Sequence, residues 1–338
     1  MESPRPGPTA PIAEHRPSAR RERSGGPDRL GRLARRAEGR LAKRVLGQPE
    51  AVASVARALR RAAAGLERPR GPLACLLFVG PTGTGKTELA RTLASELGSE
   101  RLLLRVDCSE FGSRHEVSRV LGAPPGYVGH EQGGALSRRI PRDRECVVLF
   151  DEVEKAHPHL HELLLQVLDE GHLTDGRGQR LDFRRSFVIL TSNAGTRELG
   201  STRDPLGFPR EEANRSVQHA TVETALGAAF APEFLARIDE VVLFRDLDAG
   251  CLQRVAARSL FELALRVRDS GRRVCFTGAV ARWAAEHGAR RAAGARGVVH
   301  CVRREIEAPL AEALLAAHPG EWIEVSIRRR RPHFAHAA

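Results

Sequence analysis

This sequence of 338 residues contains no long apolar run and very few lysines. No run approaches the roughly 18 uncharged apolar residues of a membrane-spanning helix, so we expect no membrane partner. The amino-terminal stretch MESPRPGPTAPIAEHRP also lacks the apolar segment of a secretory signal. These absences predict a cytoplasmic location.

Paired cysteines are missing too. The six cysteines are widely spaced, form no CxxC pair and mostly sit in apolar, strand-like segments. They are Cys75, Cys108, Cys146, Cys251, Cys275 and Cys301. This pattern argues against a disulfide framework or a cysteine-based metal site, and it favours buried thiols of a reducing compartment.

Basic charge is abundant but unevenly placed. The formal net charge is +12. Residues 1–44 hold twelve Lys or Arg against five acids, and the residues from Arg328 onward add +4, which leaves only +1 for residues 45–327. A nucleic-acid-binding core is therefore not indicated. The terminal arms can contact RNA, DNA or an acidic partner, although solvated arms are the simpler interpretation.

Composition and periodicity divide the chain into four regions. Residues 1–29 are rich in Pro, Arg, Ser and Gly and predict a disordered basic leader. Residues 30–244 begin with helical spacing and then alternate short apolar runs with helical stretches, as in a parallel β-sheet flanked by helices. Residues 245–328 predict a smaller, mostly helical domain, and residues 329–338 a basic tail. The expected fold class is α/β with a smaller helical carboxyl-terminal domain.

The segment GPTGTGKT is the strongest chemical signal. It fits GxxxxGK[ST] between the apolar run LLFV and the helical stretch ELARTLASEL, the setting that a phosphate-binding loop requires. Glycines let backbone N–H groups face phosphate oxygens, while Lys86 reaches the outer phosphates and Thr87 binds Mg²⁺. Only three of the 54 basic residues are lysines, so a lysine here indicates that a compact ammonium is needed. The loop residues are Gly80, Pro81, Thr82, Gly83, Thr84, Gly85, Lys86 and Thr87.

Two further predicted strands end in polar side chains. The run VVLF is followed by Asp151 and Glu152, which suit Mg²⁺ binding and activation of an attacking water. The run VILTS is followed by Asn193, an amide at the sheet edge where ligands bind in such folds. Each signal is weak alone, because acids often end strands and Asn often caps a turn. Together with the upstream loop they indicate nucleotide hydrolysis.

Two arginines and one tyrosine are candidates for roles beyond the phosphate loop. Arg237, just before a final strand, can project into the nucleotide of a neighbouring subunit, and Arg296 can bridge the two domains. Tyr127 and Val128 lie in the Gly/Pro-rich segment GAPPGYVG. An aromatic residue there can line a central hole and grip an extended chain, but a plain β-turn whose Tyr covers a core edge is the alternative.

These residues together resemble the Clp family of AAA+ protein unfoldases, specifically the second ATPase module of the ClpB, ClpC and ClpA types. The resemblance runs from Val45 to about Ile327 through GPTGTGKTELA, GAPPGYVG, LFDEVEKAHP, LLQVLDEGHLTDGRG, ILTSNAG and PEFLARIDEVV. It implies an AAA+ P-loop core, a homohexamer, and ATP with Mg²⁺ bound between subunits. ATP is expected to enter beside the segment Val45–Gln48, where Val45 and Leu46 bind it.

The same resemblance implies a role for each motif. Lys86 and Thr87 look like Walker A, Asp151 and Glu152 like Walker B, Asn193 like sensor one, Arg237 like the arginine finger, Arg296 like sensor two, and Tyr127 with Val128 like the pore loop. The segment Leu206-Gly207-Phe208 is similar to the loop by which ClpC- and ClpA-like rings dock on a ClpP-type peptidase. The family's amino-terminal domain, first ATPase module and middle domain have no counterpart in this sequence, and Gly297 follows Arg296 where the family has proline.

We therefore expect an ATP-dependent protein unfoldase or translocase that serves as the ATP-binding subunit of a Clp-type protease. The alternatives are a ClpB-like remodelling chaperone that works without a protease, a nucleic-acid-associated AAA+ protein, and a regulatory subunit of a larger Clp ring.

Overall fold

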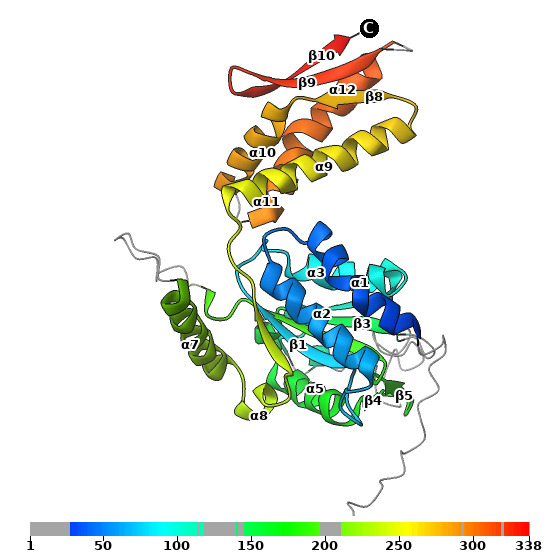
Figure 1. Ribbon diagram of the computed structural model, residues 1–338, viewed down its shortest axis with the longest axis vertical. Coiled ribbons are helices and arrows are strands. Elements are labelled where there is room, and N and C mark those ends of the chain that lie inside the picture. Colours follow the sequence, from blue (N-terminus) through cyan, green and yellow to red (C-terminus); the bar gives the residue numbers. More distant parts are fainter. Residues whose placement is uncertain are drawn as a thin grey trace, which may run out of the picture.

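A computed structural model describes residues 28–113, 115–117, 140, 145–196, 211–291, 294–318 and 321–337. The described chain forms two units, each with its own hydrophobic core (Figure 1). We call residues 28–244 the large unit and residues 249–337 the small unit. The small unit lies beyond one edge of the central sheet of the large unit.

Two amphipathic helices open the described chain, α1 (Asp28–Arg44) and α2 (Pro49–Ala64). Apolar residues recur in them at three- and four-residue spacing, so each helix buries one face. Pro49 occupies the first turn of α2, where its missing N–H is not needed, and Gly65 ends that helix with a φ of 75°. Because α1 begins at Asp28, the last two residues of the predicted leader belong to a helix.

A five-stranded parallel sheet forms the centre of the large unit, in the order β2-β3-β6-β1-β7. The strands are β1 (Ala74–Val79), β2 (Leu103–Asp107), β3 (Cys146–Asp151), β6 (Ser186–Ser192) and β7 (Glu240–Leu243). Strands β1, β3 and β6 are buried along their whole length, which explains their nearly unbroken apolar sequences. The predicted α/β fold with a parallel sheet is confirmed.

Helices and short turns connect these strands. They are α3 (Lys86–Glu96), η1 (Glu100–Leu102), η2 (Cys108–Glu110), η4 (Val153–Lys155), α5 (Pro158–Glu170), α7 (Glu211–Ala229) and α8 (Pro232–Leu235), with a hairpin of β4 (His172–Thr174) and β5 (Arg180–Asp182). Because β1, β3 and β6 run in the same direction, their carboxyl ends meet at one edge of the sheet. The polar residues that follow these strands in the sequence are thereby brought together.

The small unit combines helices with a three-stranded sheet of order β10-β9-β8. Its elements are α9 (Ala249–Asp269), β8 (Arg273–Phe276), α10 (Gly278–Arg291), α11 (Gly294–Val302), η5 (Arg303–Glu307), α12 (Ala308–Ala316), β9 (Trp322–Arg328) and β10 (Arg331–Ala337). Its core is filled by apolar side chains such as Val280, Val298 and Ile323. The predicted helical carboxyl-terminal domain is confirmed, with a small sheet in addition.

Residues 329–338, predicted as a basic tail, contain a strand instead. β10 pairs antiparallel with β9, and Phe334 packs against the small-unit core. Arg329 and Arg330 form the turn between the two strands with φ values of 47° and 65°. Two-residue hairpin turns of this kind prefer Asn and Gly, so the usual turn signal was missing from the sequence.

Some predicted segments lie outside the described residues. They are most of the leader, residues 1–27, and the residues Tyr127, Val128, Leu206, Gly207 and Phe208.

All six cysteines are described, and none forms a disulfide. Five are buried, and Cys275 is exposed. Among the described helices, none combines the length and the apolar character needed to cross a membrane.

Candidate functional site

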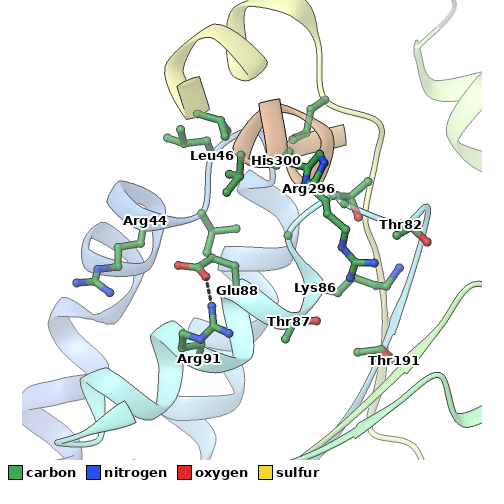
Figure 2. A pocket seen from close by; sticks show the side chains of 18 of the residues that line it. Arg44, Leu46, Thr82, Lys86, Thr87, Glu88, Arg91, Thr191, Arg296 and His300 are labelled. Carbon is green, nitrogen blue, oxygen red and sulfur yellow. Dashed lines mark hydrogen bonds and ion pairs between the residues drawn. The ribbon is translucent and has the colours of Figure 1, made fainter. Parts of the chain in front are cut away.

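A cavity of about 680 Å³ opens where the carboxyl ends of the central strands meet the small unit. Its walls come from the α1–α2 turn, the loop into α3, the ends of β3 and β6, and helices α9 and α11. The predicted site residues that line it are Val45, Leu46, Thr82, Gly83, Thr84, Gly85, Lys86, Thr87, Asp151, Glu152, Asn193 and Arg296. Side chains that are far apart in the sequence therefore face one cavity (Figure 2).

The loop between β1 and α3 curls because three glycines adopt positive φ, Gly80 at 155°, Gly83 at 81° and Gly85 at 107°. A Cβ at Gly80 would collide with the backbone of Phe244, so the close approach of these segments requires glycine. The loop leads directly into α3, whose first residue is Lys86. The unpaired N–H groups of this helix start therefore lie at the cavity, an arrangement that suits an anion such as phosphate.

Lys86 is buried beneath the loop. Its ammonium donates hydrogen bonds to the carbonyl of Gly80, to that of Pro81 at 3.0 Å, and to Oδ1 of Asn193 at 2.8 Å. Burial lowers the pKa of Lys86 from 10.5 to about 8, although nearby carboxylates, chiefly Asp151, oppose this shift. Lys86 thus joins the loop to the end of β6, and its desolvated charge attracts an anion more strongly than a charge in water does.

Asp151 and Glu152 stand at the end of β3. Oδ2 of Asp151 lies 2.7 Å from the guanidinium of Arg105, and Oδ1 accepts a hydrogen bond from the hydroxyl of Thr191. Glu152 has φ 58° and ψ 49°, a left-handed conformation that non-glycine residues rarely adopt, and its carboxylate pairs with Lys155. Such conformations gather at functional sites, so the backbone itself supports a role for Glu152.

Helix α11 of the small unit touches the loop directly. The N–H of Ala295 donates to the carbonyl of Gly83 at 2.8 Å. Gly294 has a φ of 66°, and a Cβ there would lie 2.5 Å from the same carbonyl. Arg296 reaches from α11 toward Lys86 in Figure 2. The small unit therefore places a guanidinium above the loop.

The α1–α2 turn closes the cavity on another side. Val45 and Leu46 line it, and an apolar pair of this kind suits an adenine ring. The buried amide of Gln48 donates to the carbonyls of Thr84 at 3.1 Å and Arg245 at 2.7 Å, and it accepts from the N–H of Arg245 at 3.1 Å. One side chain thus ties the phosphate loop to the segment that enters the small unit.

Family models match both units. Residues 71–241 match the AAA domain (Cdc48 subfamily), and residues 247–325 match the carboxyl-terminal, D2-small domain of ClpB protein. The chain belongs to the AAA family.

Curated relatives narrow the assignment within the AAA family. The ATP-dependent Clp protease ATP-binding subunits ClpC of Staphylococcus saprophyticus and Staphylococcus epidermidis are 42% and 41% identical to this chain over 292 residues. That of Staphylococcus aureus (strain USA300) is 40% identical over the same length. Each alignment covers 86% of this chain but only 36% of the relative. The predicted resemblance to a Clp-type AAA+ module is confirmed, and the chain spans about a third of the length of these relatives.

Among the described residues, three predicted site residues of this AAA module do not line the cavity: Gly80, Pro81 and Arg237. Gly80 and Pro81 remain next to it, because their carbonyls accept hydrogen bonds from the ammonium of Lys86. The third is Arg237. It follows α8, its guanidinium pairs with Asp169 near the end of α5, and its carbonyl accepts from Arg68 at 2.9 Å. Its side chain is 36% exposed. Arg237 therefore lies on the surface, where a neighbouring molecule can reach it.

The AAA cavity also fits a magnesium ion that accompanies a nucleotide. Thr87 offers a hydroxyl and Asp151 a carboxylate to the same cavity. These are donor types that Mg²⁺ takes in proteins when phosphates and water complete its shell. Within the described residues, no group of three or more His, Cys, Asp or Glu is arranged to hold a metal.

The sequence placed ATP beside the segment that contains Gln48 but did not indicate the contacts of the Gln48 amide. Two other contributions to the AAA site were overlooked: the Thr191 hydroxyl, and Arg258 of α9, which donates to the carbonyl of Arg44 at 2.6 Å. Thr191 precedes Asn193 by two residues, and strand alternation puts such residues on one face, so a signal was present. No motif indicates the contacts of Gln48 and Arg258, because their partners are distant in the sequence.

Proposed function

We propose that this AAA module hydrolyses ATP within a ring of like subunits, and that hydrolysis drives the unfolding of protein substrates. The observation that carries the proposal is that the predicted site residues lie in two separate places. Most residues expected to bind the nucleotide line one cavity, and Gly80 and Pro81 bond to Lys86 in that cavity, whereas Arg237 lies on the surface outside it. An arginine finger supplied by an adjoining subunit requires this division.

Within one subunit, Val45 and Leu46 hold the adenine, and the loop Gly80–Thr87 holds the phosphates. Lys86 and Asn193 face the outermost phosphate, and Glu152 orients and deprotonates the attacking water. Thr87 and Asp151 would hold Mg²⁺, which neutralises phosphate charge when bound. Arg296 senses the nucleotide from the small unit.

The adjoining subunit completes the site with Arg237, which stabilises the charge that develops on the transferred phosphoryl group. We propose a homohexamer, in which each subunit offers one cavity and one finger.

The substrates proposed are protein chains, gripped by Tyr127 and Val128 at the centre of the ring. The curated relatives are named as ATP-binding subunits of ATP-dependent Clp proteases. By analogy we propose that Leu206, Gly207 and Phe208 dock on a ClpP-type peptidase, in the cytoplasm. Replacing these three residues should abolish degradation of a tagged fluorescent protein in the presence of ClpP while leaving ATP turnover unchanged.

A mixing experiment tests the shared site. Glu152→Gln removes the base of a subunit's own cavity, and Arg237→Ala removes the finger offered to the neighbour. Each variant alone should be inactive. In a random equal mixture, about a quarter of the interfaces pair an intact cavity with an intact finger, so activity should partly return. If Arg237 served its own cavity, the mixture would stay inactive.

A further inference from the structure

The hydroxyl of Thr191 contacts both acidic residues of the site. Thr191 lies on β6, between β3 and β1, and is 1% exposed. Its Oγ1 bonds to Oδ1 of Asp151 and lies 2.9 Å from the backbone nitrogen of Glu152. The sheet register fixes its place from both sides, with Phe78 opposite Thr191 on β1 and Phe150 opposite the preceding residue on β3.

The direction of each hydrogen bond follows from chemistry. A carboxylate only accepts and a backbone N–H only donates, so the Thr191 hydroxyl must donate to Asp151 and accept from Glu152. A hydroxyl has one proton and free lone pairs, which makes both bonds possible at once. A single oxygen atom therefore restrains a side chain on one residue and the backbone of the next.

Each bond has a consequence for the site. The Asp151 carboxylate is held between Thr191 on Oδ1 and Arg105 on Oδ2, so its orientation is fixed. The N–H of Glu152 is held where φ is 58°, a conformation that is unfavourable for a side-chain-bearing residue without such support. The backbone conformation of Glu152 sets the direction in which its side chain, and therefore its carboxylate, points.

We propose that Thr191 is a positioning residue that sets the Asp151 carboxylate for magnesium and the Glu152 carboxylate for water through one hydroxyl. This inference rests on the proposed ATP hydrolysis. In this role Thr191 acts through Asp151 and Glu152 and not on a reacting atom.

Thr191→Val removes the hydroxyl while nearly keeping the shape, and Thr191→Ser keeps the hydroxyl while removing a methyl group. Thr92→Val is the matched control, because Thr92 is also 1% exposed, and within the described part of the chain its hydroxyl bonds only to the carbonyl of Glu88 in its own helix. The full chain of each variant is assayed for ATP turnover. Binding of a fluorescent ATP analogue is measured with and without Mg²⁺, and thermal unfolding checks integrity.

We expect Thr191→Val to lower kcat and to weaken the Mg²⁺-dependent gain in analogue affinity, each by about 10- to 100-fold, as for other residues that orient a metal ligand. Affinity without Mg²⁺ should stay near that of the parent. Thr191→Ser should recover most of both losses, and Thr92→Val should behave as the parent.

Parent-like kcat and Mg²⁺ dependence in Thr191→Val would overturn the inference. So would a Thr191→Ser variant as impaired as Thr191→Val, because the methyl group would then matter and the hydroxyl would not. An equal loss in Thr92→Val would reduce the effect to general packing. If the parent chain does not hydrolyse ATP, the proposed function fails, while the Mg²⁺-dependent binding comparison still decides the role of Thr191.

Discussion

The two units bury different kinds of side chain. Every buried polar or charged residue of the described chain belongs to the large unit. These residues are Gln48, Ser54, Thr84, Lys86, Thr92, Asp151, Asp175, Ser186, Thr191 and Ser192. The described core of the small unit consists of Leu, Val, Ala and Ile. Buried polar groups need partners in specific places, whereas apolar groups need only a close fit. The large unit therefore fixes the chemistry, and the small unit is a scaffold that presents Arg296.

Polar contacts between the described parts of the two units involve both backbone and side chains. Arg258 of α9 lies 3.8 Å from the carboxylate of Glu88 on α3. Ala295 donates to Gly83, and Arg258 donates to the carbonyl of Arg44. Units with separate cores that meet through a limited polar interface can change their relative position at low cost. We therefore expect the wall built by the large unit to be rigid and the wall carried by the small unit to move, and we call them the rigid wall and the movable wall. The predictions below test the contribution of each wall separately.

Lys86→Ala removes the buried ammonium beneath the loop and should have the largest effect. Because a desolvated ammonium stabilises charge on the outer phosphates, we expect ATP turnover to fall by about 100-fold or more. Lys43→Ala, an exposed lysine of α1, is the control and should match the parent. Turnover is measured by phosphate release. Turnover within a few-fold of the parent in Lys86→Ala would show that the rigid wall does not carry the chemistry.

Gly294→Ala tests the movable wall. The new Cβ would lie 2.5 Å from the carbonyl of Gly83, and the φ of 66° is unfavourable for alanine, so α11 must shift away from the loop. A penalty of about 1–2 kcal/mol, the usual cost of a left-handed residue with a side chain, corresponds to roughly tenfold weaker nucleotide binding. Gly278→Ala is the control, because nothing lies within 4 Å of its added Cβ. Titration with a fluorescent nucleotide measures both, and equal affinities would mean that the contact with Gly83 is dispensable.

The residues that form the rigid wall could largely be predicted from the sequence. The contacts that join the two walls could not. Lys86, Asp151 and Asn193 follow apolar runs that the sequence marks as strands, so a parallel sheet brings them together without further information. The Gln48 amide reaches Arg245, 197 positions away, and nothing local to either residue indicates this pairing. Strand β10 escaped prediction because an Arg-Arg turn lacks the usual Asn-Gly signal. The pore-loop role of Tyr127 and the peptidase-docking role of the segment Leu206–Phe208 remain predictions.

The pH dependence of nucleotide binding sharpens the account of the rigid wall. The pKa of Lys86 without nucleotide is about 8, so its charged form gives way to the neutral amine above that pH. Phosphate needs the charged form, and the charged fraction falls about fivefold between roughly pH 7 and pH 8.7. Affinity should fall by up to that factor, and Lys86→Arg should remove the dependence because guanidinium stays charged. A parent profile as flat as that of Lys86→Arg would contradict the lowered pKa.

The lowered pKa of Lys86 also affects the stability of the fold. Nucleotide affinity should fall as the pH rises, whereas the Lys86 contribution to stability should increase. A lysine whose pKa is about 8 in the folded chain and 10.5 when unfolded releases its proton earlier in the folded state. The unfolded chain then binds more protons between these values, so the Lys86 contribution to the free energy of unfolding rises with pH across this range. Comparison of parent and Lys86→Met unfolding at several pH values isolates this contribution.

Replacing the turn Arg329-Arg330 by Asn-Gly should stabilise the small unit without affecting nucleotide binding. Both arginines have positive φ, and Arg328 and Arg331 lie directly opposite each other, so a left-handed turn and like charges are combined in one hairpin. Asn-Gly suits this turn, and we expect a gain of about 1 kcal/mol in the free energy of unfolding. Chemical denaturation measures the gain, and nucleotide titration should show unchanged affinity. A change in affinity would mean that the hairpin and the cavity are coupled through the small-unit core, and the scaffold would then take part in nucleotide binding.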